Sequence, residues 1–191
     1  MKKAVFLDRD GVINENVEDL TKPEQLVIMK GAAEAIKRIN DSGYLAVVVT
    51  NQPIIAKGFC TFKDMGRIHS RLKELLARKG ARIDAIYVCP HHPEKGFEGE
   101  VKELKTDCKC RKPKPGLLLQ AAKDMGIDLK KSWMVGDSYT DIAAGKKAGT
   151  GTVYLSSGSR VEEDLKKVNP DFSVKTLPEA VELILKASGS I

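Results

Sequence analysis

Short continuous runs of apolar residues alternate along this chain with segments in which apolar residues return at every third or fourth position. The continuous runs predict buried strands, because a strand covered on both faces needs no polar side. They lie at residues 4–7, 45–50, 83–89, 133–136, 152–155 and 172–174, the last being a short edge strand. The periodic segments predict helices at about residues 31–42, 61–80, 115–125, 140–148 and 177–186.

The ends of several predicted helices carry their own signals. Thr61 and Asp64 have the spacing of a capping box, although Asp stands in place of the usual Glu or Gln. Pro115 opens another helix, and Gly43 follows the first one at a position suited to a helix end. Because strands and helices alternate, the sequence predicts an α/β fold: a Rossmann-like, doubly wound and mostly parallel sheet with helices on both faces.

Residues 1–191 are expected to form a single domain, since one domain occupies roughly 150 residues. Only about twenty residues separate the first strand from the first helix, and no other gap could hold a separate cap domain. The carboxyl edge of the sheet is therefore expected to be open. The one long irregular segment, residues 90–113, needs either a function or a staple.

Composition narrows the classes of protein. Hydrophobic residues make up 42% and charged residues 30% of the chain, which fits a globular protein. The longest apolar run, residues 44–49, is too short for a membrane span, and the N-terminus lacks the apolar core of a signal peptide, so a cytoplasmic protein without a membrane partner is expected. The net charge of +6 is compatible with solubility, with nucleic-acid contact or with the capture of an anionic small molecule, and does not choose among them. The 5% of aromatic residues do not interleave with basic ones, which disfavours nucleic acid.

Polar residues follow three of the predicted strands. Asp8, Thr50 and Asp137 each stand at or just beyond a strand's carboxyl end, where parallel sheets bind ligands. Asp8 and Asp10, with Gly11 turning the chain, suit phosphoryl transfer, because one carboxylate can attack phosphorus while the other donates a proton. Two adjacent carboxylates also attract Mg²⁺. An isolated Asp-x-Asp, however, is more often a solvated turn.

Further polar residues supply what such a site needs. Thr50 and Asn51 offer a hydroxyl, an amide and backbone N–H groups to phosphate oxygens, although alone they would be an Asx turn. Arg111 and Lys112 bring two cations, or else ordinary surface charge. Asp137 adds a third carboxylate for Mg²⁺, unless it caps a helix.

Three cysteines and one histidine form a second pattern, which comprises Cys89, His91, Cys108 and Cys110. Three thiolates and one imidazole make a tetrahedral Zn²⁺ set with no position left for water, which is typical of a structural site. His92 is an alternative to His91, and three unrelated thiols are the competing interpretation. Zinc would staple the long irregular segment and hold the adjacent cations against the substrate.

The motifs occur in the order Asp-x-Asp-Gly at 8–11, Thr-Asn at 50–51, Lys at 112 and Gly-Asp-x₃-Asp at 136–141. In this order the sequence resembles the haloacid dehalogenase-like phosphohydrolases. The resemblance implies that Asp8 is the nucleophile and that Asp10 is the general acid and later the base. It also implies that Thr50 and Lys112 bind the phosphoryl oxygens. Mg²⁺ would be held by the side chains of Asp8 and Asp137 and the backbone carbonyl of Asp10.

A narrower resemblance rests on four longer motifs: Asp-Arg-Asp-Gly-x-Ile-Asn at 8–14, Val-Thr-Asn-Gln at 49–52, Cys-Pro-His-His-Pro at 89–93 and Cys-x-Cys-Arg-Lys-Pro-x-Pro-Gly at 108–116. Over residues 4 to about 155 the chain looks like the D-glycero-D-manno-heptose 1,7-bisphosphate 7-phosphatases, whose subgroup includes histidinol-phosphate phosphatases. The resemblance implies that His91, rather than His92, completes the zinc set. It also implies substrate contacts from Asn16, Val17, Glu18, Asp19, Thr50, Asn51, Gln52, Pro53, Arg111 and Lys112.

Some residues depart from that family's pattern, above all Pro53, Ile54 and Ile55, where Ser-Gly-Ile is usual. Because these changes lie around the leaving group, the reaction is better defined than the substrate. The sequence predicts a monomeric, Mg²⁺-dependent phosphatase that removes the 7-phosphate of a heptose 1,7-bisphosphate. The alternatives are a histidinol-phosphate phosphatase, a nucleic-acid end phosphatase and a zinc-loop binding module without turnover. Neither the preferred anomer nor a role for Cys60 follows from the sequence.

Overall fold

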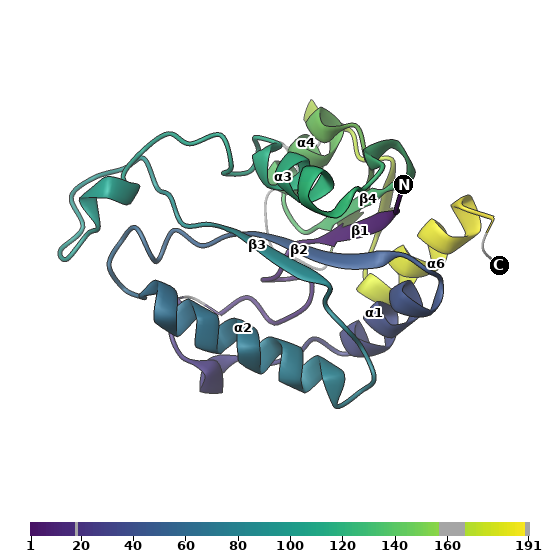
Figure 1. Ribbon diagram of the computed structural model, residues 1–191, viewed down its shortest axis with the longest axis horizontal. Coiled ribbons are helices and arrows are strands. Elements are labelled where there is room, and N and C mark those ends of the chain that lie inside the picture. Colours follow the sequence, from purple (N-terminus) through teal and green to yellow (C-terminus); the bar gives the residue numbers. More distant parts are fainter. Residues whose placement is uncertain (18, 157–166, 190–191) are drawn as a thin grey trace.

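A computed structural model describes residues 1–17, 19–156 and 167–189 of this chain. Its centre is a sheet of six parallel strands in the order β3-β2-β1-β4-β5-β6 (Figure 1). The strands are β1 (Ala4–Leu7), β2 (Leu45–Asn51), β3 (Ala85–Cys89), β4 (Trp133–Gly136), β5 (Gly151–Leu155) and β6 (Phe172–Val174). This order places β1 and β4, which precede the predicted carboxylates, side by side at the middle of the sheet.

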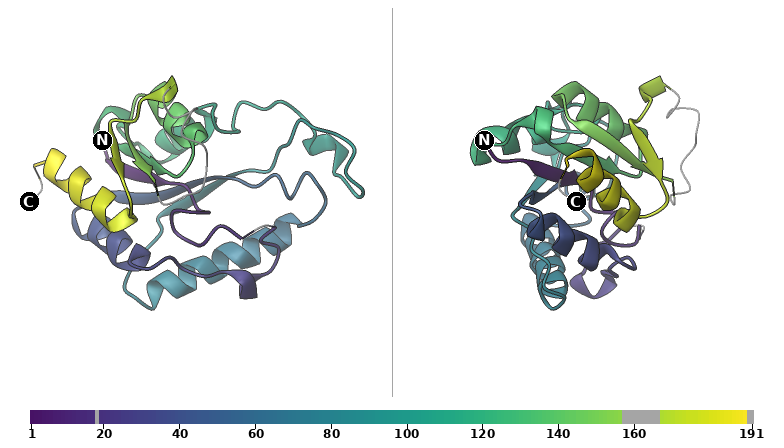
Figure 2. Two further views of the ribbon diagram at one scale, coloured as in Figure 1. Left: turned by 180° about the vertical axis from the view of Figure 1, so that it is seen from behind. Right: turned by 90° about the vertical axis from the view of Figure 1, so that its right-hand side faces the viewer.

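Helices cover both faces of the sheet, as Figures 1 and 2 show. One layer holds α1 (Ala32–Asp41), α2 (Phe62–Ala77) and α6 (Leu177–Ala187). The other holds α3 (Gly116–Met125) and α4 (Tyr139–Ala148). The predicted α/β fold with a doubly wound sheet is confirmed, and every described strand pair is parallel.

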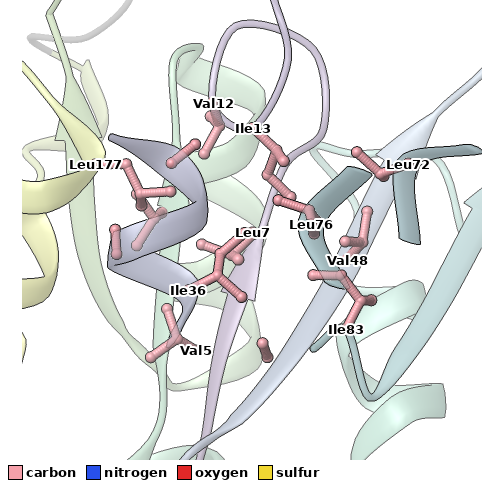
Figure 3. Packing of buried hydrophobic residues seen from close by; sticks show 14 of the residues in the cluster. Val5, Leu7, Val12, Ile13, Ile36, Val48, Leu72, Leu76, Ile83 and Leu177 are labelled. Atoms are coloured by element: carbon pink, nitrogen blue, oxygen red, sulfur yellow. The ribbon is translucent and has the colours of Figure 1, made fainter. Parts of the chain in front are cut away.

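The alternation of side chains along β1 explains why both layers are needed. Val5 and Leu7 pack into the core beneath α1, α2 and α6, whereas Ala4 and Phe6 pack toward α3 and α4. Figure 3 shows the first of these cores, where Leu7 and Ile36 lie against each other beneath Val12 and Ile13. Burying a side chain of this size contributes roughly 1.5–3 kcal/mol relative to leaving it exposed. The first strand is therefore fixed from both sides immediately before Asp8.

Most helix and strand ends lie within two residues of their predicted positions. α3 begins at Gly116, so that Pro115 is its N-cap residue, and α4 begins one residue early at Tyr139. β3 begins at Ala85 rather than at Ile83, because the Asp84 carboxylate accepts the Ala46 N–H at 2.8 Å in place of a regular ladder bond. The capping box of Thr61 and Asp64 is present at the start of α2.

The segment between β3 and α3 extends beyond the carboxyl ends of the strands, on the side away from both chain termini (Figure 1). Its only regular element is a single 3₁₀ turn, η2 (Lys102–Leu104). Between β1 and α1 the described residues form one 3₁₀ turn, η1 (Pro23–Gln25), and no cap domain; Glu18, a predicted substrate contact, lies outside the described residues. Within the described ranges, no helix combines the length and the apolar character needed to cross a bilayer.

Candidate active site

Two carboxylates and one ammonium group meet where β1, β2 and β4 end. Lys112 Nζ lies 2.8 Å from Asp8 Oδ1 and 2.6 Å from Asp141 Oδ1, and it donates to the Val49 carbonyl at 2.8 Å. The side chains of Lys112 and Asp8 are largely buried, and that of Asp141 is fully buried. Because water is excluded, the charges act on one another at much lower screening than on the surface.

This burial shifts both titrations. Burial raises the pKa of Asp8 to about 7, and it outweighs the lowering effect of the adjacent Lys112 cation. Burial alone would lower the pKa of Lys112, but the Asp141 and Asp8 carboxylates raise it above its ordinary value. Lys112 is therefore a fixed cation beside a buried carboxylate, an arrangement that suits the binding of a further charged group.

A third carboxylate, that of Asp137, completes a cluster with Asp8 and Asp141 in which one oxygen of each lies within 4.8 Å of the others. Asp137 can lie close to the turn after β1 because residue 11 is a glycine. Its φ of +82° favours glycine, and a Cβ at this position would lie 2.1 Å from Asp137 Oδ2. The buried oxygens Asp8 Oδ1 and Asp141 Oδ1 both face Lys112 Nζ. Three carboxylate oxygens that converge in this way fit the ligand preference of Mg²⁺.

The cation itself is held by the neighbouring strand end. Asn51 donates through Nδ2 to the Lys112 carbonyl and accepts from the Lys112 N–H through Oδ1, both at 3.1 Å. This reciprocal pair joins the end of β2 to the irregular segment before α3. Asn51 therefore fixes the backbone of Lys112, a tighter role than the Asx turn that its sequence position alone would suggest.

The Asp10 carboxylate faces a different set of partners. It accepts hydrogen bonds from Arg9 at 2.9 Å, from Asn14 at 2.9 Å and from Gln52 at 2.8 Å. Gln52 Nε2 also lies 2.9 Å from Thr50 Oγ1. Asp10 is thus oriented by neutral amides and a guanidinium, while its sequence neighbour Asp8 belongs to the carboxylate cluster.

The Cys89, His91, Cys108 and Cys110 side chains also converge. Cys108 Sγ lies 3.5 Å from Cys89 Sγ and 3.2 Å from Cys110 Sγ. His91 Nδ1 lies 3.3 Å from Cys110 Sγ and 3.6 Å from Cys89 Sγ. Tetrahedral ligands at zinc bond lengths of about 2.0–2.3 Å would be separated by roughly 3.3–3.8 Å. The donor set and its spacing therefore fit Zn²⁺.

The neighbouring histidine points elsewhere. The His92 ring packs edge-on against Phe97 with a centroid separation of 5.8 Å, and its Nε2 lies 3.8 Å from Glu94. Of the two histidines, the structure brings His91 to the thiols. Cys60 is buried and lies outside the cluster. Arg111 donates to the His91 carbonyl at 3.3 Å, so the cluster and the basic pair before α3 are in direct contact.

Comparison with known proteins agrees with this arrangement. A model of the HAD-hydrolase-like family matches residues 109–180. A Pasteurella multocida protein named D-glycero-beta-D-manno-heptose-1,7-bisphosphate 7-phosphatase is 40% identical over 186 residues, which are 96% of this chain and 97% of that protein. The chain belongs to the heptose-bisphosphate phosphatase family of haloacid dehalogenase-like hydrolases.

Other members of the heptose-bisphosphate phosphatase family support the assignment. A Photorhabdus laumondii protein named for the alpha anomer of the same substrate is 42% identical over 153 residues, 80% of this chain and 81% of that protein. The D,D-heptose 1,7-bisphosphate phosphatase of B. bronchiseptica, solved with magnesium and phosphate, superposes with a TM-score of 0.82 at 29% identity, covering 97% of this chain and 99% of that one. The predicted family is confirmed, and so is the class of enzyme, a phosphoric monoester hydrolase.

A cavity of about 460 Å³ opens beside the carboxylates of this family member. Its lining includes these residues expected from sequence: Asp8, Asp10, Asn16, Val17, Asp19, Asn51, Gln52, Pro53, Arg111, Lys112 and Asp137. Thr50 is not among the lining residues, because its side chain is buried behind Gln52. Lys57 and His92 also line the cavity; Lys57 is not singled out by any sequence motif, and His92 is considered there only as a zinc ligand.

Two contributors to the site were not singled out from the sequence. Asp141 was noted only as the residue that closes the Gly-Asp-x₃-Asp motif, yet it is the fully buried partner of Lys112. Its position four residues after Asp137, at the third residue of a helix capped by Ser138, was the available signal. The burial of Arg9 in the site could not be predicted from the sequence, because a charged residue in a turn is ordinarily exposed.

Proposed function

We propose that this chain removes the 7-phosphate of a D-glycero-D-manno-heptose 1,7-bisphosphate through an aspartyl-phosphate intermediate on Asp8. The observation that carries the proposal is the cluster of Asp8, Asp137 and Asp141 around a buried Lys112 at the carboxyl edge of the sheet. A nucleophile, a fixed cation and a set of metal-binding oxygens then share one cavity with Asp10.

The first half of the reaction transfers the phosphoryl group. A carboxylate oxygen of Asp8 attacks phosphorus, the bond from phosphorus to the C7 oxygen breaks, and Asp10 gives its proton to that leaving oxygen. Lys112 stabilises the negative charge of the transferring group. Mg²⁺ held by Asp8, Asp137 and the Asp10 carbonyl would neutralise the phosphate charge that otherwise repels the nucleophile. Asp141 keeps Lys112 in place from the opposite side.

The second half releases phosphate. Asp10, now a carboxylate, takes a proton from water as that water attacks phosphorus, and the bond between phosphorus and the Asp8 oxygen breaks. The site returns to its starting protonation state, with Asp8 ionised and Asp10 protonated. Asn51 would assist from the end of β2 by fixing Lys112. Thr50 Oγ1 accepts from Gln52 at 2.9 Å, so it would bond a phosphoryl oxygen only after Gln52 moves aside.

The cysteine cluster has a structural part in this proposal. Zn²⁺ bound by Cys89, His91, Cys108 and Cys110 would close the irregular segment between β3 and α3. That segment carries Arg111, which lines the cavity and contacts the His91 carbonyl. Substrate contacts from residues 16–19, 51–53 and 111 are supported by the cavity lining for all except Glu18.

The test is a comparison of kcat/KM on four substrates with Mg²⁺ present: the two heptose 1,7-bisphosphate anomers, histidinol phosphate and an oligonucleotide with a terminal phosphate. One heptose anomer should be preferred over histidinol phosphate by at least about tenfold. Both anomers are needed because relatives are named for each. A higher value for histidinol phosphate, or for the oligonucleotide, would replace the proposed substrate while leaving the chemistry at Asp8 intact.

A further inference from the structure

Arg9 stands between Asp8 and Asp10 in the sequence, yet its side chain is only 1% exposed. A guanidinium has five N–H donors and no acceptor, and a buried cation needs a partner for each. Nε and Nη2 donate to the Asp10 carboxylate at 2.9–3.1 Å. Nη1 faces two residues of α2, Met65 Sδ at 3.3 Å and His69 Nε2 at 3.2 Å. All three guanidinium nitrogens thereby face acceptors.

His69 must be the acceptor in its contact with Arg9 Nη1. Because the guanidinium can only donate, His69 Nε2 must accept, which requires a ring nitrogen without a proton. Burial first and then the Arg9 charge lower the pKa of His69 to about 4, so the imidazole is neutral near pH 7. Two other charged groups face this ring, Asp10 with a raising and Lys73 with a lowering effect.

We propose that His69 is a positioning residue for proton transfer: by accepting from Arg9 Nη1 it fixes the guanidinium whose opposite edge orients the Asp10 carboxyl group. The inference rests on the proposed function, in which Asp10 protonates the leaving oxygen. His69 itself has no place in the cavity lining. It would act through Arg9, from a helix that the reaction does not otherwise use.

Among the described residues, Arg9 supplies three of the five side-chain hydrogen bonds that the Asp10 carboxylate accepts. Apart from Arg9, its carboxylate oxygens accept from Asn14 and Gln52. Without an acceptor at residue 69, one buried N–H of the guanidinium loses its partner, which costs free energy that rotation of Arg9 would relieve. Rotation would shift the Asp10 carboxyl group, and a displacement of about 1 Å in a reacting group lowers rates by large factors.

The leaving group provides a readout that a merely structural role would not move. An alkoxide leaves from the heptose substrate only when it is protonated, whereas p-nitrophenolate leaves without a proton. The value of kcat/KM covers the steps up to departure of the leaving group, so the later attack of water does not enter. A misplaced Asp10 therefore lowers kcat/KM for the sugar phosphate and leaves that for p-nitrophenyl phosphate nearly unchanged.

The experiment compares the Mg²⁺-loaded wild-type enzyme with His69→Leu and His69→Gln on these two substrates. His69→Leu should lower the ratio of sugar to aryl kcat/KM about tenfold, and His69→Gln, which keeps an acceptor, should restore it to within about twofold. The inhibition constant of inorganic phosphate should stay within about twofold. Lys63→Leu, at an exposed position of the same helix, is the matched control and should leave the ratio unchanged.

An equal loss on both substrates, an unchanged ratio, or no rescue by His69→Gln would each overturn the role of His69. If His69→Leu does not fold, His69→Lys also lacks an acceptor and is expected to lower the same ratio. Asp10→Asn is measured in parallel. If Asp10→Asn lowers the ratio and His69→Leu does not, only the inference about His69 fails. If Asp10→Asn leaves the ratio unchanged, the acid role of Asp10 in the proposed function fails, and the His69 role with it.

Discussion

The carboxylate cluster and the cysteine cluster lie on either side of Arg111 and Lys112, but they are built in different ways. Asp8 and Asp137 directly follow packed strands at the middle of the sheet, Asp141 lies in the first turn of α4, and Lys112 pairs with Asp8 and Asp141. Of the cysteine cluster only Cys89 belongs to a strand; Cys108 and Cys110 lie in the irregular segment after η2. The strands of the sheet position the carboxylate cluster, whereas the cysteine cluster lies mostly in an irregular segment outside the sheet and would itself stabilise that segment.

The difference follows from what each metal would contribute. The carboxylates at the sheet edge are positioned by packed strands and by Lys112, so the fold itself would place the ligands of Mg²⁺. The segment between β3 and α3 has few apolar residues to bury, so thiolate and imidazole bonds to zinc would replace a hydrophobic core. Removing Mg²⁺ is expected to stop the chemistry, whereas removing zinc is expected to change the structure locally.

The largest effect is expected at Asp8, the proposed nucleophile. Asp8→Asn keeps the size of the side chain but removes the attacking carboxylate, so kcat should fall at least about 10³-fold, while the thermal unfolding midpoint stays near that of the wild type. Turnover of a heptose bisphosphate by purified protein measures the loss. Asp41→Asn, at an exposed position of α1, is the control and should be fully active. Activity of Asp8→Asn near the wild-type level would remove the aspartyl-phosphate from the mechanism.

Lys112 tests whether the carboxylate cluster is held by charge. Lys112→Met leaves Asp8 and Asp141 buried without their cation, and removing one partner of a buried pair costs about 3–5 kcal/mol of unfolding free energy. Urea unfolding of the metal-free protein measures the change. The matched control is Lys114→Met, which breaks a more exposed pair with Asp107 and should cost about 0–1 kcal/mol. Equal stabilities of the two variants would show that the ion pair does not maintain this edge.

Zinc removal tests the other cluster. Cys108→Ser, or treatment with a chelator, should raise hydrogen exchange within residues 90–113 and raise KM about tenfold, while exchange in the sheet stays slow. Mass-spectrometric exchange with segment resolution separates these outcomes. Cys60→Ser is the control, because Cys60 is buried outside the cluster. Unchanged exchange in the segment, or cooperative unfolding of the whole chain, would contradict the idea of a local staple.

The sequence predicted the fold and the two clusters for physical reasons that also explain what it missed. Apolar runs and helical periodicity report burial, and parallel strands bring their carboxyl ends together, so the meeting of Asp8 with Asp137 could be foreseen. Arg9 could not, because its burial depends on acceptors from Met65 and His69, which lie 56 and 60 residues further along the chain. Such a contact requires the packing of α2 against the turn after β1, which no local pattern encodes.

The smallest effect is expected from the pH dependence of stability at His69, the histidine that contacts Arg9. An unfolded histidine has a pKa of about 6.5, while burial lowers that of His69 to about 4. Between these values the unfolded chain binds a proton that the folded chain does not, so the unfolding free energy falls as pH drops from 6.5 toward 4. His69→Gln should lessen this decline by on the order of 1–3 kcal/mol, measured as the difference between two urea titrations. If the two proteins lose stability in parallel over this range, His69 is not held neutral in the folded protein, and the Arg9 contact is weaker than its geometry implies.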